Sequence, residues 1–476
     1  MRLILQPAGD QRNLAKLLAA AGCPLDLRCG GNGTCGRCRV KLCSGEWEVD
    51  GRPLSVPAEA NACRTRLVSP RGEVDVPERS MAATRGQVAT AWRGLPLPDS
   101  DETVIAIDLG TTTVAAAKLH GREIVREASC FNSQSRFGDN VITRINHAGS
   151  SPEALGELRR AAADSINELL IQLDPSDAVR IAVAGNTVMS CLFHGIDPSS
   201  IGVMPFTPPC RVFPVRSAAE LGLRAGEIPV LTVPAIAGYV GGDLTAGLFE
   251  TRLKPGELLV DIGTNCEIIL RSEKGFFCTA AAAGPAFEGA GIHCGCRAVP
   301  GAVDHYFGNG SFSVIGQGVA PVGLCGSAMI DFLAVERRLG HLNEFGRIQP
   351  PADSFEVAPG VSINEWEIEQ LLKAKAAVCA GIQTLSRHCG IAVRKIYLAG
   401  GFARYLDLGN AVGCGLLPGG CELEAVGNTS LGGAARLALD PGVAAELENL
   451  IDLPREIPLN LLPEFEDNYI DGLLLP

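Results

Sequence analysis

The sequence has few aromatic side chains and no basic run. Phe, Trp and Tyr make up 5% of the 476 residues, and the net charge is -12 at pH 7. Proteins that bind nucleic acids usually carry clustered Lys and Arg, together with aromatic side chains on which bases stack. Because both are scarce here, we expect no nucleic-acid partner.

The chain also lacks a long uninterrupted apolar run and an N-terminal export signal. Its most apolar stretch, residues 229–248, is interrupted by Pro234, four glycines and Asp243. Residues 1–7 alternate like a strand instead of placing a basic segment before an apolar core. We therefore expect no membrane span and a cytoplasmic location. In that reducing compartment the 18 cysteines are expected to be free thiols or cluster ligands rather than disulfides.

The length favours two or three folding units. Residues 1–80 predict a small β-rich domain of ferredoxin type, β-grasp-like, with one short helix at 14–21. Residues 81–102 lack periodicity and contain Pro96 and Pro98, which indicates a linker.

Three cysteines lie within ten glycine-rich residues of the small domain, in the order Cys29, Cys35 and Cys38. Their C-x5-C-x2-C spacing is one residue longer than the plant-type [2Fe–2S] pattern. Cys63 is the nearest plausible fourth ligand, and Cys43 is the runner-up. A zinc site is the alternative, but zinc sites favour paired C-x2-C motifs or histidines, and the first 100 residues contain no histidine.

From residue 103 the pattern changes to that of a duplicated domain. The sequence Ile-Ala-Ile-Asp-Leu-Gly-Thr-Thr at Asp108 is repeated as Leu-Leu-Val-Asp-Ile-Gly-Thr-Asn at Asp261, 153 positions later. Each copy predicts a hairpin whose backbone N–H groups and hydroxyls can cradle phosphate oxygens. The carboxylates repel phosphate, so they need Mg²⁺ between them and the phosphates. One copy alone would be typical of an ordinary β-turn; two copies favour a nucleotide site.

We expect nucleotide-binding residues at three turns and at three further positions. Candidates in the hairpins and in the glycine turn after strand 395–399 are Gly110, Thr111, Thr112, Thr113, Gly263, Thr264, Asn265, Gly400, Gly401 and Phe402. Asn186, Asp243 and Ser327 are additional candidates in glycine-rich or hydroxyl-rich turns.

Two long helices are predicted at residues 152–173 and 364–388. Ser150 with Glu153, and Ser362 with Glu365, have the spacing of capping boxes. We divide the domain into subdomains at 103–250 and 251–440. The tail at 441–476 is expected to pack back on the ATPase domain.

The paired hairpins and the glycine turn resemble the phosphate-1, phosphate-2 and adenosine motifs of the acetate and sugar kinase/Hsp70/actin (ASKHA) superfamily. This resemblance implies a duplicated, actin-like α/β fold of RNase H type beside the α+β ferredoxin domain. It also implies an ATPase in which Asp108 and Asp261 hold Mg²⁺ and position the attacking water.

A ferredoxin domain joined to such an ATPase resembles the reductive activators of corrinoid enzymes. The resemblance includes Ala-Gly-Asn-Thr-Val-Met at 184–189, Tyr-Val-Gly-Gly-Asp at 239–243 and the closing Leu-Leu-Pro at 474–476. It implies one-electron reduction of Co(II) to Co(I) in the corrinoid protein of a methyltransferase system, through a [2Fe–2S] cluster and with ATP hydrolysis. It also implies an upstream low-potential donor of ferredoxin or flavodoxin type. A homodimer is one arrangement to test.

Two other functions stay open from the residues alone: ATP-gated electron transfer to another low-potential enzyme, and a small-molecule kinase with an appended ferredoxin. The kinase would need a hydroxyl-activating base, which we do not identify. Cys294 and Cys296 resemble a metal motif but are expected to be structural thiols, as is Cys266 beside the second hairpin.

Overall fold

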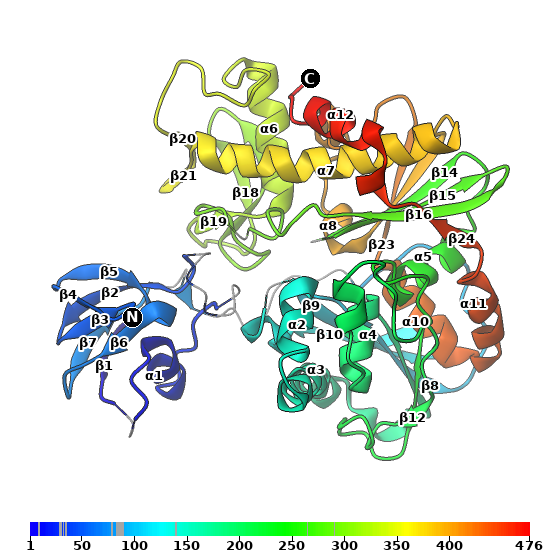
Figure 1. The fold of residues 1–476 in the computed structure, drawn as a ribbon, viewed down its shortest axis with the longest axis horizontal. Helices are drawn as coiled ribbons and strands as arrows, with labels where there is room; N and C mark the ends of the chain where they lie inside the picture. Colours follow the sequence, from blue (N-terminus) through cyan, green and yellow to red (C-terminus); the bar gives the residue numbers. More distant parts are fainter. Residues whose placement is uncertain are drawn as a thin grey trace.

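The computed structural model describes residues 1–7, 10–27, 31, 33, 36–77, 80–81, 90–138, 140–263, 265–289 and 291–476. Three of the predicted site residues, Cys29, Cys35 and Thr264, lie outside these ranges. The chain forms a small N-terminal domain and two larger lobes (Figure 1).

The small domain is built from two short sheets and one helix. One sheet has the order β1-β7-β2-β5 and the other has the order β4-β3-β6. Their bounds are β1 Arg2–Leu5, β2 Arg39–Ser44, β3 Trp47–Val49, β4 Arg52–Leu54, β5 Ala58–Asn61, β6 Thr65–Leu67, β7 Gly72–Asp75 and α1 Leu14–Ala20. Leu18, Leu42, Trp47 and Leu67 are buried together between these elements and form the centre of a compact apolar core.

The first lobe has a six-stranded sheet with the order β10-β9-β8-β11-β13-β12. The bounds are β8 Thr103–Leu109, β9 Thr113–His120, β10 Glu123–Phe131, β11 Arg180–Ala184, β12 Arg216–Ser217 and β13 Pro229–Thr232. Alternate residues of β8 face opposite layers: Ile105 and Ile107 pack toward helices α2 Val141–Ala148, α3 Pro152–Leu173 and α4 Thr187–His194. Val104 and Ala106 pack toward α5 Gly242–Thr251 and α10 Thr429–Leu439. Burial of both faces explains why this strand is almost continuously apolar.

The second lobe repeats the topology of the first. Its sheet has the order β23-β22-β14-β15-β16, with β24 added beside β16. The bounds are β14 Glu257–Ile262, β15 Cys266–Ser272, β16 Gly275–Ala281, β22 Lys395–Ala399, β23 Glu422–Gly427 and β24 Pro454–Glu456. In both lobes an antiparallel three-stranded meander is followed by parallel strands, since β8 pairs with β11 as β14 pairs with β22. The predicted duplication and fold class are therefore confirmed.

Most of the remaining elements cover the second lobe. They are α6 Gly326–Leu339, α7 Glu365–Cys389, α8 Gly400–Arg404, α9 Leu408–Gly413, α12 Pro463–Gly472, β17 Ala302–Gly308, β18 Ser311–Val314, β19 Gly323–Leu324, β20 Phe355–Ala358 and β21 Val361–Ile363. Helix α11 Ala444–Leu450 instead packs through Leu447 with α5 and α10 of the first lobe. The tail returns to the second lobe: α12 lies along α7 (Figure 1), and the buried Lys375 of α7 donates to the Leu474 carbonyl at 2.7 Å.

The two predicted capping boxes are wrong in position. Helix α3 is capped by Ser151, which accepts from the Ala154 N–H, and α7 is capped by Asn364 in a capping box with Glu367. The side chains of Ser150 and Ser362 could also accept a hydrogen bond from a backbone N–H group. The direction from which the chain enters each helix decides which residue becomes the cap.

Part of the segment assigned to the linker packs on the lobes. Trp92 bridges to Gly427 at the end of β23, and the Leu95 N–H donates to Glu250 at 3.0 Å. The same carboxylate pairs with the buried Arg436 of α10, with an Nε–Oε1 distance of 2.6 Å. Helix α10 therefore joins the linker to the first lobe, although it follows the last large strand of the second.

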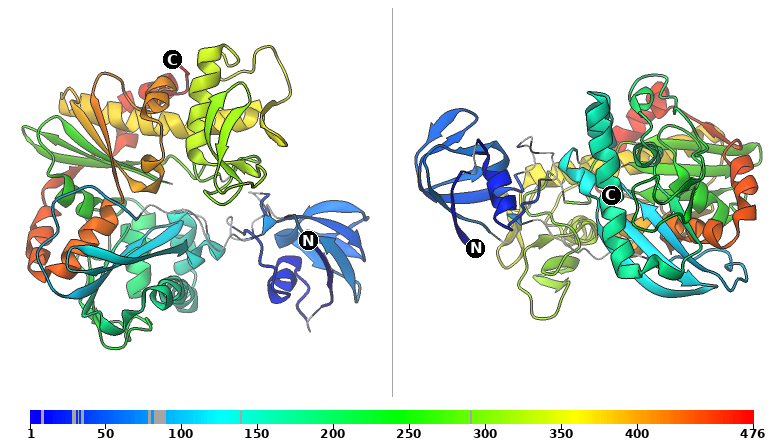
Figure 2. Two further views of the ribbon diagram at one scale, coloured as in Figure 1. Left: turned by 180° about the vertical axis from the view of Figure 1, so that it is seen from behind. Right: turned by 90° about the horizontal axis from the view of Figure 1, so that it is seen from below.

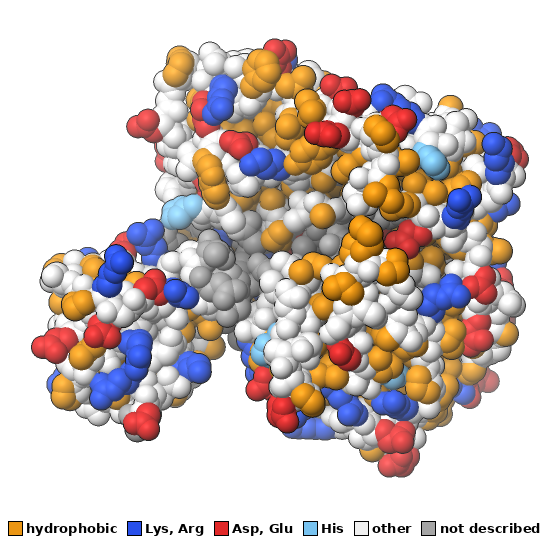
Figure 3. Space-filling model, viewed as in Figure 1, with side chains coloured by type: hydrophobic (Ala, Val, Ile, Leu, Met, Phe, Trp, Pro, Cys, Tyr) orange, Lys and Arg blue, Asp and Glu red, His pale blue; other side chains and the backbone are white. Residues whose placement is uncertain are grey.

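The small domain stands to one side of the two lobes, as the views in Figures 1 and 2 agree. Acidic and basic side chains are interspersed over the face seen in Figure 3. Among the residues that the structure describes, every helix is too short or too polar to cross a membrane.

Candidate functional site

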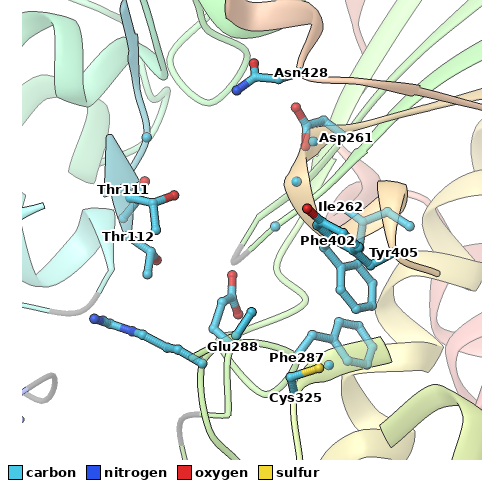
Figure 4. Close-up of a pocket in the computed structure, with 18 of the residues that line it drawn as sticks. Thr111, Thr112, Asp261, Ile262, Phe287, Glu288, Cys325, Phe402, Tyr405 and Asn428 are labelled. Atoms are coloured by element: carbon cyan, nitrogen blue, oxygen red, sulfur yellow. The ribbon is translucent and has the colours of Figure 1, made fainter. Parts of the chain in front are cut away.

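A cavity of about 280 Å³ lies between the two lobes and collects the predicted nucleotide residues. Its lining includes Asp108, Gly110, Thr111, Thr112, Thr113, Asn186, Asp243, Asp261, Gly263, Asn265, Ser327, Gly400, Gly401 and Phe402. Figure 4 shows Thr111 and Thr112 on one wall and Asp261 with Phe402 on the other. The two hairpins thus face each other across one cavity.

Asp108 ends strand β8 and is held by two donors from the other end of the chain. Asn428 Nδ2 donates to Oδ2 at 2.8 Å, and Ser430 Oγ donates to Oδ1 at 2.9 Å. Burial raises the pKa of Asp108, and these two hydrogen bonds partly oppose the shift. Asn428 also caps α10, accepting from the Leu431 N–H, so one side chain orients both the helix and the carboxylate.

Further acids line the same cavity, and three of them have raised pKa values: Asp243, Asp261 and Glu267. Burial, with repulsion from neighbouring carboxylates, raises the pKa of Asp243 to about 7 and that of Asp261 to about 8. Burial and the charges of Asp243 and Asp261 also raise the pKa of Glu267, while a hydrogen bond from Asn186 opposes this. Buried carboxylates that repel one another are stabilised by a cation, and oxygen ligands suit Mg²⁺.

These acids line the cavity without converging on one point. Among the described residues, no group of three or more His, Cys, Asp or Glu side chains is arranged to hold a metal ion directly. Mg²⁺ keeps several of its waters and usually takes one or two carboxylates together with substrate phosphates. The donor set therefore fits a water-mediated Mg²⁺–phosphate site.

The tip of the first hairpin is fixed from behind by two buried polar residues. Asn132 donates from Nδ2 to the Gly110 carbonyl at 2.8 Å and from its N–H to the Thr112 carbonyl at 2.9 Å. Arg144, with no exposed surface, donates to the Thr111 carbonyl at 2.7 Å. Because the carbonyls of the tip are occupied, its hydroxyls and remaining N–H groups are left for a ligand.

Gly400 lets the third turn approach the second hairpin. Its φ is +89°, and a Cβ there would lie 2.5 Å from Asp261 Oδ1. Any other residue would be strained and would displace the carboxylate. The glycine at position 400 is therefore explained by its close approach to Asp261.

Several helices begin at the cavity. Asn186, Asp243, Ser327 and Asn428 lie at or near the N-termini of α4, α5, α6 and α10, and all line it. Unpaired N–H groups and the helix dipole at such ends favour anions. Ser327 itself donates to the Asp304 carbonyl at 2.6 Å, so its hydroxyl can only accept from a ligand.

The opposite end of the cavity is apolar. Phe402 stacks on Phe287 with ring centroids 5.2 Å apart and an interplanar angle of 9°. Tyr405 and Ile262 lie beside them (Figure 4). A flat heteroaromatic base suits this end, while the polar end suits phosphates.

Several lining residues were not predicted from the sequence, among them Glu267, Glu288, Arg297, Asn428 and Ser430. Glu267 comes two residues after the second motif on β15, and alternation along that strand could have indicated it. Arg297 is the single Lys or Arg among the described residues that line the cavity; its guanidinium lies 4.2 Å from the centroid of the Phe131 ring, which belongs to the other lobe.

Of the four predicted cluster ligands, the structure describes Cys38 and Cys63; Cys29 and Cys35 lie outside the described residues. The two segments are joined by the Ala62 N–H, which donates to the Cys38 carbonyl at 2.9 Å. Asn61 Nδ2 donates to the Gly33 carbonyl at 3.1 Å, and a Cβ at Gly31 would lie 3.8 Å from Cys63 Cβ. The cysteine loop therefore passes beside Cys63, which fits the four-cysteine set.

Cys43 lies too far away to replace Cys63. It is five positions beyond Cys38 on β2, roughly 16 Å at the rise of a strand. It lines a different surface hollow with Arg2, Lys41, Pro57 and Asp75. The described cysteines, including Cys266, Cys294 and Cys296, form no disulfide among themselves. Burial raises the pKa of the Cys266 and Cys294 thiols, which fits structural thiols.

The comparisons with known families agree with this architecture. Residues 5–68 match the 2Fe-2S iron-sulfur cluster binding domain. Residues 103–255 match the RACo middle region, and residues 256–476 match the C-terminal domain of RACo, the ASKHA domain. The chain is thus an iron–sulfur protein that carries an ASKHA ATPase domain. Because the two RACo matches together span everything from residue 103 onward, the chain belongs to the RACo family.

Curated relatives and a solved structure extend the comparison. The corrinoid activation enzyme RamQ of Eubacterium limosum is 29% identical over 77% of this chain and 69% of its own length. The [Co(II) methylated amine-specific corrinoid protein] reductase of Methanosarcina barkeri is 28% identical over 74% of this chain and 72% of its own length. A solved reductive activator for a corrinoid, iron-sulfur protein is 27% identical with a TM-score of 0.72, covering 98% of this chain and 96% of that one.

Proposed function

We propose that the chain is an ATP-dependent reductive activator that returns the cobalt of a corrinoid protein from Co(II) to Co(I). The main support for this proposal is that one chain joins a domain of the cluster-binding family to an acid-lined cavity suited to a nucleotide. The named activities of the RamQ and Methanosarcina relatives support the same substrate class. In each reaction one electron leaves the cluster, which is oxidised, and the cobalt gains it.

The cluster would be held by Cys29, Cys35, Cys38 and Cys63. When bound, it supplies one electron at a time. Cys38 is 1% exposed, whereas Cys63 is half-buried. Of these two proposed ligands, Cys38 is therefore the one shielded from solvent. The low exposure limits the access of water to this ligand.

The nucleotide would lie with its base near Phe287 and Phe402 and its phosphates between the hairpins. Asp108 and Asp261 would hold Mg²⁺ through water and position the attacking water. The chain contributes positioning and charge neutralisation, which dominate phosphoryl transfer. The hairpin residues and Asn186, Asp243 and Ser327 complete the proposed contacts.

ATP would act by shifting the balance between an open and a closed cleft. The closed form is the one that binds the Co(II) partner, and hydrolysis reopens it. ATP can move this balance only as far as its affinity differs between the two forms.

We further propose a low-potential donor of ferredoxin or flavodoxin type, because the cluster must be reduced again after each turnover. A cytoplasmic location is supported by the described cysteines, which form no disulfide among themselves. Whether the chain forms a homodimer is a question for sedimentation analysis.

An anaerobic experiment tests the proposal. Reduced protein is mixed with a Co(II) corrinoid protein, and the visible spectrum is recorded with and without MgATP. We expect the Co(I) spectrum to appear quickly only with MgATP. Equal formation of Co(I) in both samples would exclude ATP gating, and no Co(I) in either would exclude the activity toward that partner.

A further inference from the structure

One side chain of the cysteine loop reaches across to the ATPase lobes. Arg37 directly precedes the cluster ligand Cys38 and is 9% exposed. Its Nη2 donates to the Gly289 carbonyl at 2.8 Å and to the Ile292 carbonyl at 2.6 Å. Both acceptors belong to the second lobe, so a buried guanidinium joins the cluster domain to that lobe.

The acceptors lie in a loop that also forms a wall of the nucleotide cavity. We use the name wall loop for residues 284–289 and 291–297, the described part of this loop. At one end of it Phe287 and Glu288 line the cavity, and at the other end Cys296 and Arg297 do. Gly289 and Ile292, which bind Arg37, lie between these two ends. The same short segment therefore contacts the nucleotide site on one side and the cluster domain on the other.

Near its first end, at Gly289, the wall loop packs directly against its second end, at Cys296. Gly289 has φ +77°, and a Cβ there would lie 2.6 Å from the Cys296 nitrogen. The second end is tied to the lobe: the Cys296 N–H donates to the Leu324 carbonyl at 2.7 Å, and the Cys294 N–H donates to Glu367 at 3.1 Å. A displacement at Glu288 or Arg297 is consequently transmitted to the carbonyls that hold Arg37.

Charge gives the direction of the coupling. MgATP brings net negative charge into the cavity beside the wall loop, and Arg37 carries a positive charge into the same wall. Attraction between partly buried opposite charges favours having both in place. Nucleotide binding should therefore strengthen the docking of the cluster domain, and docking should strengthen nucleotide binding to the same degree.

We propose that Arg37 is the positioning residue through which the nucleotide site controls the placement of the cluster domain. MgATP in the cleft stabilises the arrangement in which Arg37 is bound to the wall loop. The inference rests on the proposed function, because it takes MgATP as the ligand and the cluster as the group to be placed. It adds a defined contact by which the closed cleft fixes the orientation of the cluster.

The test compares Arg37→Ala with Arg39→Ala in the holoprotein under anaerobic conditions. Arg39 is a matched control because it lies two positions away, is half-exposed and pairs with Glu59 of its own domain at 3.1 Å. The affinity for a non-hydrolysable ATP analogue with Mg²⁺ is measured by calorimetry. We expect at least about a fivefold loss for Arg37→Ala, the lower end of common coupling effects, and less than about a twofold change for Arg39→Ala.

Amide hydrogen exchange supplies a readout that a purely structural role would not give. In the wild type, MgATP analogue should slow exchange in peptides covering 36–44, and Arg37→Ala should lose this effect. Should Arg37→Ala lose the visible spectrum of the cluster, Arg37→Lys retains the charge and is expected to show an intermediate loss of affinity.

Unchanged analogue affinity in a cluster-containing Arg37→Ala protein would overturn the inference. So would the absence of any nucleotide effect on exchange at 36–44 in the wild type, a measurement that needs no variant. Neither readout includes a corrinoid protein. A chain that shows the coupling but never forms Co(I) would contradict the proposed function and leave this inference standing.

Discussion

Asp108 and Asp261 occupy the same position in two lobes of the same topology, yet their carboxylates have different surroundings. Asp108 accepts hydrogen bonds from Asn428 and Ser430. Among the described residues, none donates such a bond to Asp261, whose close neighbour is Gly400. Duplication has repeated the backbone of the hairpin without repeating the groups around its carboxylate.

The difference arises because helix α10 packs against the first lobe and contacts Asp108 but not Asp261. Helix α10 follows the sheet of the second lobe but packs under the sheet of the first, bringing Asn428 and Ser430 to Asp108. Asp261 instead has burial and the charges of Asp243 and Asp108, which raise its pKa to about 8. We infer that Asp108 is the fixed carboxylate and Asp261 the one whose protonation responds to Mg²⁺.

The largest expected effect is on ATP turnover in Asp108→Asn and Asp261→Asn. Each removes a carboxylate that we propose holds the Mg²⁺ neutralising the phosphates, so phosphate release should fall at least about 100-fold in both. Thermal unfolding without nucleotide should separate them. Asp108→Asn keeps one oxygen acceptor but sets an NH2 group against the other buried donor, so it should be destabilised; Asp261→Asn relieves repulsion and should not be.

The matched control for both variants is Asp99→Asn, since the side chain of Asp99 is 89% exposed and forms only a surface pair with Arg122. It should leave turnover and stability unchanged. In both cleft variants the visible spectrum of the cluster should stay intact. Normal ATP turnover in Asp261→Asn would show that the carboxylate of the second hairpin is not needed for hydrolysis.

The next effect is a pH dependence of nucleotide binding. Asp243 and Asp261, with pKa values of about 7 and about 8, are protonated at lower pH and must lose their protons to serve Mg²⁺. MgATP affinity should therefore rise between pH 6 and pH 9, by up to about tenfold per pH unit for each proton released. Calorimetry in buffers of different ionisation enthalpy measures both affinity and proton release.

Stability without Mg²⁺ should change in the opposite direction. A carboxyl group whose pKa is higher in the folded than in the unfolded protein hardly changes the free energy of unfolding at pH 4. It lowers that free energy as the pH rises toward the folded pKa. In Asp261→Asn, the rise in MgATP affinity near pH 8 should vanish, together with this residue's share of the stability loss between about pH 4 and pH 8. If the pH dependence of MgATP affinity and of stability persists unchanged in this variant, Asp261 is not the group whose protonation changes.

The smallest expected effect is that of Ser430→Ala. It removes one of the two donors to Asp108 and should lower the free energy of unfolding by about 1 kcal/mol. It should also make Asp108 more like Asp261, shifting the pH dependence of MgATP binding upward. Ser430→Thr keeps the hydroxyl and should behave as the wild type; a loss as large as that of Ser430→Ala would indicate a packing effect instead.

Much of the fold and the site could be predicted because the motifs are local. A strand, a glycine and two hydroxyl residues form a hairpin from their own conformational preferences, and the repeat revealed the second lobe. Helix capping was predicted less well: the true caps are Ser151 and Asn364, each one or two positions from the residue expected. Neighbouring polar residues compete for a cap, and tertiary packing decides among them.

Residues that contribute through long-range contacts gave no local signal. Asn428 and Ser430 lie 320 and 322 positions from Asp108, and Arg37 lies 252 positions from Gly289. No short pattern in the sequence relates such pairs. The pKa shifts of the acids escaped prediction for the same reason, because burial and mutual distance cause them.

Residue order alone was enough to indicate the cysteine loop, the two Asp-x-Gly-Thr hairpins, the glycine turn at 400–401 and, through them, the class of protein. These are sets of adjacent residues whose chemistry depends on their own order. Packing between distant segments settled three further features: among the described residues Asp108 receives two hydrogen bonds and Asp261 none, Cys63 and not Cys43 lies beside the loop, and Arg37 joins the small domain to the loop that lines the cavity. Those features depend on which surfaces meet when the lobes and the small domain pack, and chain order does not specify such contacts locally.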